Sequence, residues 1–241
     1  MRKFITYFLA TLSLTFGLVA NAMATGISLA ELIDPQCEVC SITVDDKLFS
    51  DFTFTIYSTD PSLTTPADAS GITVSPFQLG SELGLAFTGG LTAQDGATLD
   101  LTIGYKVTVL DPNRMLSDIH LIFNGQASLG SHTSVIETVL DAMPDPGQLA
   151  LIGEASVQDP PDGQHEELID LSRMVRMALV QKDIILQAAN LPLIGGNVTI
   201  SVVDQLFSQK RQDNEIPEPC TLLLLGSGLL GAGIRLRGKR A

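Results

Sequence analysis

The chain has 241 residues, 45% of them hydrophobic, with 27 acidic and 14 basic residues and a formal net charge of −13. Residues 25–214 hold 25 of the acids and eight of the bases, a net charge of about −17, which is expected to exclude nucleic acid and anionic lipid as partners. This stretch suits one domain with a sizeable core, whereas three cysteines are too few for a disulfide scaffold.

Residues 1–24 have the features of a secretory signal peptide, which forms a helix. Arg2 and Lys3 supply the positive start, Phe4–Ala20 the apolar core, and Ala20–Ala22 or Ala22–Ala24 an A-x-A cleavage site. We expect signal peptidase to cleave after Ala22 or Ala24. Residues 25–214 should then fold outside the cytoplasm.

Two cysteines, Cys37 and Cys40, form a C-x-x-C sequence early in the mature chain. A redox site of this spacing sits at a helix N-terminus in a thioredoxin-like fold, and a zinc ribbon needs a second cysteine pair. Neither context is present. The sequence favours a local disulfide or a free pair of thiols over a catalytic role, and it predicts no metal site here.

Strand patterns dominate residues 25–214, the body of the chain. Leu99–Val109 places six apolar residues at strict period two, and Asp51–Ser58 and Val198–Val202 alternate in the same way before the last pattern breaks at Val203. Turn sequences such as Asp60-Pro61 separate the strands. Long strands without alternating helices predict an all-β fold, a two-sheet antiparallel β-sandwich over residues 25–214.

Two stretches also fit a helix. Ser28–Ile33 is short enough to be one helical turn or a loop. Glu166–Leu186 carries leucines at helical spacing, but its part from Met174 is rich in β-branched residues and is predicted to be a strand. Asp141–Gly147, with two prolines, is predicted to be the longest exposed loop.

Catalytic chemistry has little support in the sequence. A hydrolytic triad needs a histidine between a nucleophile and an acid. The three histidines are His120, expected on the wet face of a strand, His132 after a turn, and His165 in an acidic loop. No G-x-S-x-G, H-E-x-x-H or glycine-rich phosphate loop is present, so we expect no enzyme.

Acidic loops offer oxygen ligands that calcium would accept. The candidates are Asp159–Gly163, Asp95 with Asp100, and Asp111 with Asn113, and none has the EF-hand pattern. Solvated acidic loops are the simpler interpretation. No cofactor is therefore expected, and calcium is kept as an alternative.

The last 27 residues, 215–241, combine three features. Pro217-Glu218-Pro219 should form a stiff, extended segment that a processing enzyme can grip. A short apolar stretch from Thr221 to Ile234 is predicted to be a transmembrane helix. The residues expected to place this helix in the membrane are Thr221, Leu222, Leu223, Leu224, Leu225, Gly226, Gly228, Leu229, Leu230 and Ile234. It is shorter than the roughly 20 residues that usually span a bilayer. The basic tail, which should hold its end in the cytoplasm and lengthen the span by snorkelling, consists of Arg235, Arg237, Lys239 and Arg240.

This ordered tail resembles the PEP-CTERM sorting signal of Gram-negative bacteria that make exopolysaccharide. The resemblance implies recognition by exosortase, a membrane cysteine peptidase, and removal of the tail. Cys220 stands where the family usually has Ser, Ala or Thr. It is interpreted as a small residue in place of serine, and lipidation or disulfide formation is the alternative.

Stretches of the body, including Ser28–Ile33, Asp46–Phe52, Leu99–Tyr105 and Gln205–Gln209, resemble uncharacterised members of the same family. The resemblance implies an extracellular β-sandwich and brings no enzyme activity. We expect an exported protein, transiently anchored in the inner membrane, that reaches the cell surface or the extracellular matrix of a biofilm as a structural or interaction protein associated with exopolysaccharide. The alternatives are a calcium-assisted module that binds polysaccharide or protein and, third, a surface hydrolase.

Overall fold

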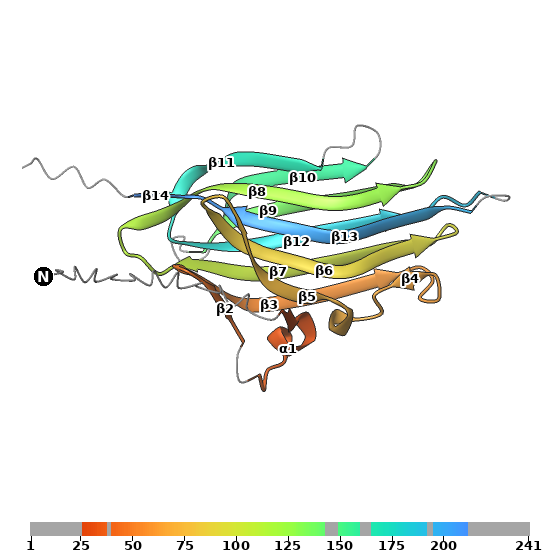
Figure 1. Cartoon of the computed structure of the whole chain (residues 1–241), viewed down its shortest axis with the longest axis horizontal. Coiled ribbons are helices and arrows are strands. Elements are labelled where there is room, and N and C mark those ends of the chain that lie inside the picture. Colours follow the sequence, from red (N-terminus) through yellow and green to blue (C-terminus); the bar gives the residue numbers. More distant parts are fainter. Residues whose placement is uncertain (1–25, 38–39, 143–148, 160–164, 192–194, 212–241) are drawn as a thin grey trace, which may run out of the picture.

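The computed structural model describes residues 26–37, 40–142, 149–159, 165–191 and 195–211. These residues form two antiparallel sheets packed face to face, with their strands running along the long axis of the molecule (Figure 1). The predicted two-sheet β-sandwich is confirmed. The predicted signal helix and C-terminal transmembrane helix lie outside the described residues.

One sheet, sheet A, has the strand order β1-β5-β6-β13-β8-β11, and two short strands join it, β14 beside β8 and β4 beside β6. Its strands are β1 (Ile27–Ser28), β4 (Thr64–Thr65), β5 (Thr73–Leu79), β6 (Glu82–Gln94), β8 (Arg114–Ala127), β11 (Glu166–Val175), β13 (Asn197–Phe207) and β14 (Gln209–Arg211). Sheet B has the order β10-β9-β12-β7-β3-β2. It consists of β2 (Ile42–Val44), β3 (Lys47–Ser58), β7 (Thr98–Val109), β9 (His132–Asp141), β10 (Ala150–Asp159) and β12 (Met177–Gln187).

Helical structure is confined to two short pieces of the described chain. Ser28 caps α1 (Leu29–Ile33) by accepting a hydrogen bond from the Ala30 amide at 3.3 Å, and a 3₁₀ turn, η1, covers Ala69–Gly71. The helical turn predicted at Ser28–Ile33 is therefore present. Among the described residues, no helix is both long enough and apolar enough to cross a membrane.

The period-two pattern of Leu99–Val109 corresponds to β7, whose apolar residues all point into the space between the sheets. Asp51–Ser58 belongs to the longer β3, which has a register shift between Ser50 and Thr53. The core that results contains the aromatic rings of Phe49, Phe52, Phe87, Tyr105, Phe123 and Phe207. Burial of these side chains is the main force that holds the two sheets together.

The ambiguous stretch Glu166–Leu186 is strand except at Arg176. β11 ends at Val175 and β12 begins at Met177, so the strand prediction from Met174 is correct except for the break at Arg176. The long loop predicted from Asp141 is wrong at its first residue, because Asp141 is the buried last residue of β9. Residues 143–148 of that prediction lie outside the described part.

Candidate functional site

The predicted sorting residues lie outside the described part of the chain. They are Pro217, Glu218 and Pro219, the apolar segment from Thr221 to Ile234, and the basic residues from Arg235 to Arg240. The described chain ends at Arg211 in β14, which pairs with Arg114 of β8. β14 and β4 lie at opposite ends of the sandwich (Figure 1), so the described chain ends at one end of the long axis.

Cys37 and Cys40 are joined by a disulfide, with their Cα atoms 5.6 Å apart. The pair follows α1, whose last residue is Ile33, and so precedes β2 rather than a helix. This position differs from the helix N-terminus at which thioredoxin-like redox cysteines are activated. The disulfide therefore closes a local loop between α1 and sheet B.

The three histidines lie in different environments. His120 is half-buried on β8, His132 begins β9, and His165 stacks on the ring of Phe123 with the ring centroids 4.9 Å apart. The backbone oxygen of His165 also accepts a hydrogen bond from the Phe123 amide at 2.9 Å. His165 therefore contacts β8 through both its ring and its backbone, just before β11 begins.

His120 belongs to a polar cluster with residues from β6 and the β13–β14 junction. Its Nδ1 lies 2.7 Å from Oε2 of Glu82, and the Ser208 hydroxyl donates to Oε1 of Glu82 at 3.1 Å. In a hydrolytic triad the histidine stands between the serine and the acid. Here the carboxylate stands between serine and histidine, so His120 is not placed to activate Ser208.

Among the acidic groups predicted as calcium ligands, Asp111 and Asp159 have protein partners, whereas residues 160–163 lie outside the described part of the chain. Oδ1 of Asp111 accepts the backbone amide of Asn113 at 2.9 Å, while Oδ2 lies 3.5 Å from Nε of Arg114. Asp95 occupies the turn before β7 and Asp100 is exposed on that strand, and Oδ2 of Asp159 accepts the Ala127 amide at 2.9 Å. No group of three or more His, Cys, Asp or Glu residues is placed to hold a metal within the described ranges.

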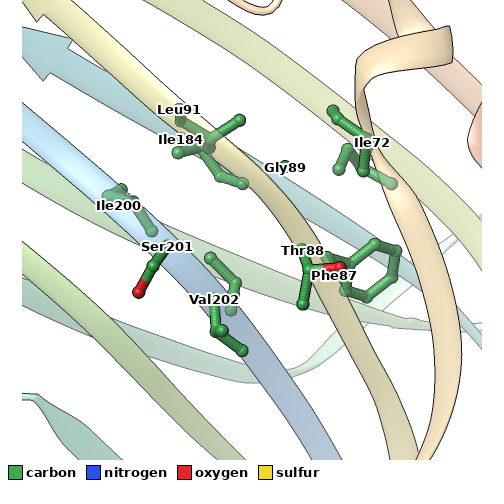
Figure 2. A pocket seen from close by; sticks show the side chains of 11 residues that line it. Ile72, Phe87, Thr88, Gly89, Leu91, Ile184, Ile200, Ser201 and Val202 are labelled. Atoms are coloured by element: carbon green, nitrogen blue, oxygen red, sulfur yellow. The ribbon is translucent and has the colours of Figure 1, made fainter.

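An apolar pocket opens where β6 and β13 of sheet A deviate from regular pairing. Figure 2 shows Phe87, Leu91, Ile184 and Ile200 around it. Its volume is only about 10 Å³, the room that a single water needs. This pocket cannot hold a sugar ring.

Three polar side chains that the sequence interpretation did not single out meet between the sheets. Lys182 of β12, Glu137 of β9 and Gln205 of β13 each have 0% of their surface exposed. Nζ of Lys182 donates hydrogen bonds to Oε2 of Glu137 and to Oε1 of Gln205, the latter at 2.5 Å. This buried cluster of Lys182, Glu137 and Gln205 is the strongest chemical feature among the described residues.

The cluster had a signal in the sequence. Lys182 occupies a period-two position between Val180 and Ile184, and Glu137 stands in the same way between Val135 and Val139. A charged residue in the middle of an inward-facing apolar row indicates burial. The sequence gives no sign, however, that the two rows and Gln205 meet at one point.

Residues 215–240 match the model of the PEP-CTERM protein-sorting motif. The chain carries a PEP-CTERM sorting motif. This motif implies export and surface localisation through exosortase, but the match covers the tail alone and assigns nothing to the β-sandwich.

No curated protein matches this chain. Solved structures with a similar arrangement include the enzymatically active domain of tailspike protein 4 from bacteriophage CBA120, at 14% identity and a TM-score of 0.31; the alignment covers 66% of this chain and 20% of the tailspike chain. The carbohydrate-binding module TmCBM61, solved with β-1,4-galactotriose, has 10% identity and a TM-score of 0.31 over 64% of this chain and 88% of its own.

A third structure concerns carbohydrate-binding modules of the β-sandwich superfamily with promiscuous specificity. It has 12% identity and a TM-score of 0.28, over 68% of this chain and 58% of its own. The chain thus spans only a fifth of the tailspike chain. Similarities at this level do not bear on what the PEP-CTERM chain binds or catalyses.

Proposed function

We propose that this chain is an exported structural or interaction protein, which exosortase processes and which ends at the cell surface or in the exopolysaccharide matrix. The observation that carries the proposal is the PEP-CTERM motif at residues 215–240. Signal peptidase removes the first 22 or 24 residues, and the C-terminal helix holds the chain in the inner membrane until exosortase acts near Pro217–Pro219.

The role assigned to the β-sandwich is mechanical and adhesive rather than catalytic. The position of Glu82 between Ser208 and His120 supports this, because the serine hydroxyl donates to the carboxylate instead of to the imidazole that a hydrolytic triad needs. The strong negative charge of residues 25–214 is consistent with a soluble surface that attracts cationic partners and does not repel neutral ones. Exopolysaccharide is the partner that the sorting signal suggests.

The test is a double substitution, Pro217→Ala with Glu218→Ala, in the native organism. The double variant lacks one of the prolines that stiffen the segment and also lacks its negative charge, so exosortase should no longer recognise it. The full-length form should therefore accumulate in the inner membrane. The wild-type chain should instead be found shortened at the surface or in the medium. Fractionation and blotting with an antibody against the β-sandwich measure both.

The matched control is Asp213→Ala with Asn214→Ala, a pair just before the motif, which should leave processing unchanged. Unchanged processing of the Pro217 and Glu218 variant would contradict the proposal.

A further inference from the structure

The buried cluster joins the two sheets across the core. Lys182 and Glu137 are direct cross-strand partners on β12 and β9 of sheet B, whereas Gln205 reaches them from β13 of sheet A. All three side chains have 0% exposure. A lysine and a glutamate that are this deeply buried are rare in proteins and need a local reason.

The amide of Gln205 is held by both of its ends. Its Oε1 accepts from Nζ of Lys182 at 2.5 Å, and its Nε2 donates to the backbone oxygen of Leu206 at 3.2 Å. Because Oε1 is bonded directly to the amide carbon Cδ, the amine also lies beside Cδ. The amine and the carbonyl carbon are thus fixed in proximity, as in a reactive pair that the fold has already oriented.

Burial disfavours the charged forms of the amine and the acid. Burial lowers the pKa of Lys182, an effect that the nearby Glu137 charge opposes, and burial raises the pKa of Glu137. The ring of Phe87 lies 5.9 Å from Nζ, so the surroundings are apolar. An uncharged amine is a nucleophile, and a protonated carboxyl group is a proton donor.

Oε1 of Glu137 is also available for proton transfer. It is buried and has no hydrogen-bond partner among the described residues, and neither has the hydroxyl group of Tyr105. The negative charge of Glu137 contributes to raising the pKa of Tyr105, after burial, so the two groups are near one another. Two buried oxygens without a hydrogen-bond partner carry a cost in stability.

We propose that Lys182 and Gln205 form an intramolecular isopeptide bond and that Glu137 promotes its formation. The lone pair of Nζ attacks Cδ of Gln205, and the new Nζ–Cδ bond forms. Glu137 donates a proton to Nε2 and takes one from Nζ, so its own protonation state is restored. The Cδ–Nε2 bond breaks and ammonia leaves; no oxidant or other reactant is consumed.

The bond would tie β12 of sheet B to β13 of sheet A and close a loop between residues 23 positions apart. A cross-link of this kind restricts the unfolded chain and resists separation of the sheets by force. Unlike the disulfide of Cys37 and Cys40, it is unaffected by reducing agents. The inference does not depend on the proposed export, although a covalent brace suits a protein that works outside the cell.

Trypsin digestion followed by mass spectrometry of the purified full-length chain tests the bond. Trypsin cleaves after Arg176, Lys182 and Lys210, but not after an acylated lysine. The expected product is one peptide, Met177–Lys210, lighter than its sequence by one ammonia, about 17 Da. Its fragmentation should show no backbone fragments that separate Lys182 from Gln205.

Two separate peptides of full mass, Met177–Lys182 and Asp183–Lys210, would show an ordinary hydrogen-bonded ion pair and overturn the proposal. A loss of about 18 Da, with Lys182 joined to Glu137, would overturn the assignment to Gln205. The digest reports on the β-sandwich whether or not the tail has been removed, so failure of the cross-link and failure of sorting are distinguishable.

Variants assign the roles. Glu137→Gln keeps the shape of the side chain but removes the acid and base, so the linked peptide should fall at least about tenfold in yield. Lys182→Met should abolish it. The control, Glu154→Gln, changes an exposed glutamate of the neighbouring strand β10 and should leave the yield unchanged. A fully linked Glu137→Gln protein would remove Glu137 from the mechanism.

Discussion

Asp204 precedes Gln205 on β13, and its surroundings in the folded protein disfavour the ionised form of its carboxyl group. Burial raises its pKa to about 6, although the positive charge of Lys182 partly opposes the rise. Its Oδ1 is buried without a hydrogen-bond partner among the described residues. If Lys182 is bonded to Gln205, this opposing charge is absent and the pKa of Asp204 rises further.

The raised pKa predicts how stability depends on pH. Well below pH 4 both the folded and the unfolded chain hold the Asp204 proton. As the pH rises toward 6, the unfolded chain loses its proton first, so this carboxyl group lowers the free energy of unfolding over that interval. Asp204→Asn should therefore stabilise the protein at pH 7, by about 1 kcal/mol.

Urea unfolding of the wild type and the Asp204→Asn variant at pH 4 and pH 7 measures this difference. The gain should shrink at pH 4. The control is Asp170→Asn, a change to an exposed carboxylate of β11, which should alter the stability little at either pH. An equal gain from Asp204→Asn at both pH values would mean that ionisation of Asp204 is not the cause.

At the scale of elements, the pairing of β6 with β13 depends on Gly84. A Cβ added there would collide with the backbone oxygen of Gln205 and lie 2.7 Å from its carbonyl carbon and 2.8 Å from Cα of Leu206. Backbone atoms can move only if the strands separate. Gly84→Ala should therefore cost at least about 2 kcal/mol of unfolding free energy and displace Gln205 from Lys182.

The control for Gly84→Ala is Gly80→Ala, which lies in the turn between β5 and β6. Gly80 has a φ of +61° with open space around it, so its substitution should cost only about 1 kcal/mol and leave the Lys182–Gln205 bond in place. Thermal unfolding and the tryptic digest measure both effects. Equal stability of the two variants would show that the strands accommodate a methyl group.

The alternation of apolar and polar residues predicted where the strands lie, but not which side chains of each strand face the core. In β13, Val198 and Ile200 point inward, and an uninterrupted strand would turn Gln205 outward. A register shift between Ile200 and Val202 reverses the alternation, so that Val203, Gln205 and Phe207 are buried. The break visible at Val203 in the sequence is the sign of this bulge, but its consequence for Gln205 requires the pairing with β6 and β8.

The ambiguity of Glu166–Val175 has a related cause. β11 is at the end of the strand order in sheet A, and one of its apolar residues, Leu168, is 59% exposed. An edge strand with few buried positions lacks the clean period of two that a central strand such as β7 shows. The surrounding chain therefore decides its conformation, and this information is not local.

For the molecule as a whole, the sequence predicted the β-sandwich from local patterns and the sorting motif from the order of its three parts. It did not predict the buried cluster, because Glu137, Lys182 and Gln205 come from three strands in two sheets. Nor did it predict that Glu82 and Ser208 would share a hydrogen-bonded cluster with His120. Both groupings depend on long-range register.

Binding of calcium would change the thermal stability of the whole molecule. The Asp111 carboxylate is occupied by Arg114 and Asn113, so a bound cation would displace a guanidinium group. We expect the same melting temperature in EDTA and in excess calcium, measured by calorimetry on the full-length chain. A rise of several degrees with calcium, but not with magnesium, would instead support the calcium-assisted binding module.

The intact mass of the protein recovered from native cells and from the medium tests the central claim most directly. Export and exosortase processing predict a mass that lacks the first 22 or 24 residues and everything beyond about Pro219. A mass that retains Thr221–Ala241 in both fractions would contradict processing. It would make the PEP-CTERM tail a permanent anchor and the β-sandwich a membrane-tethered domain.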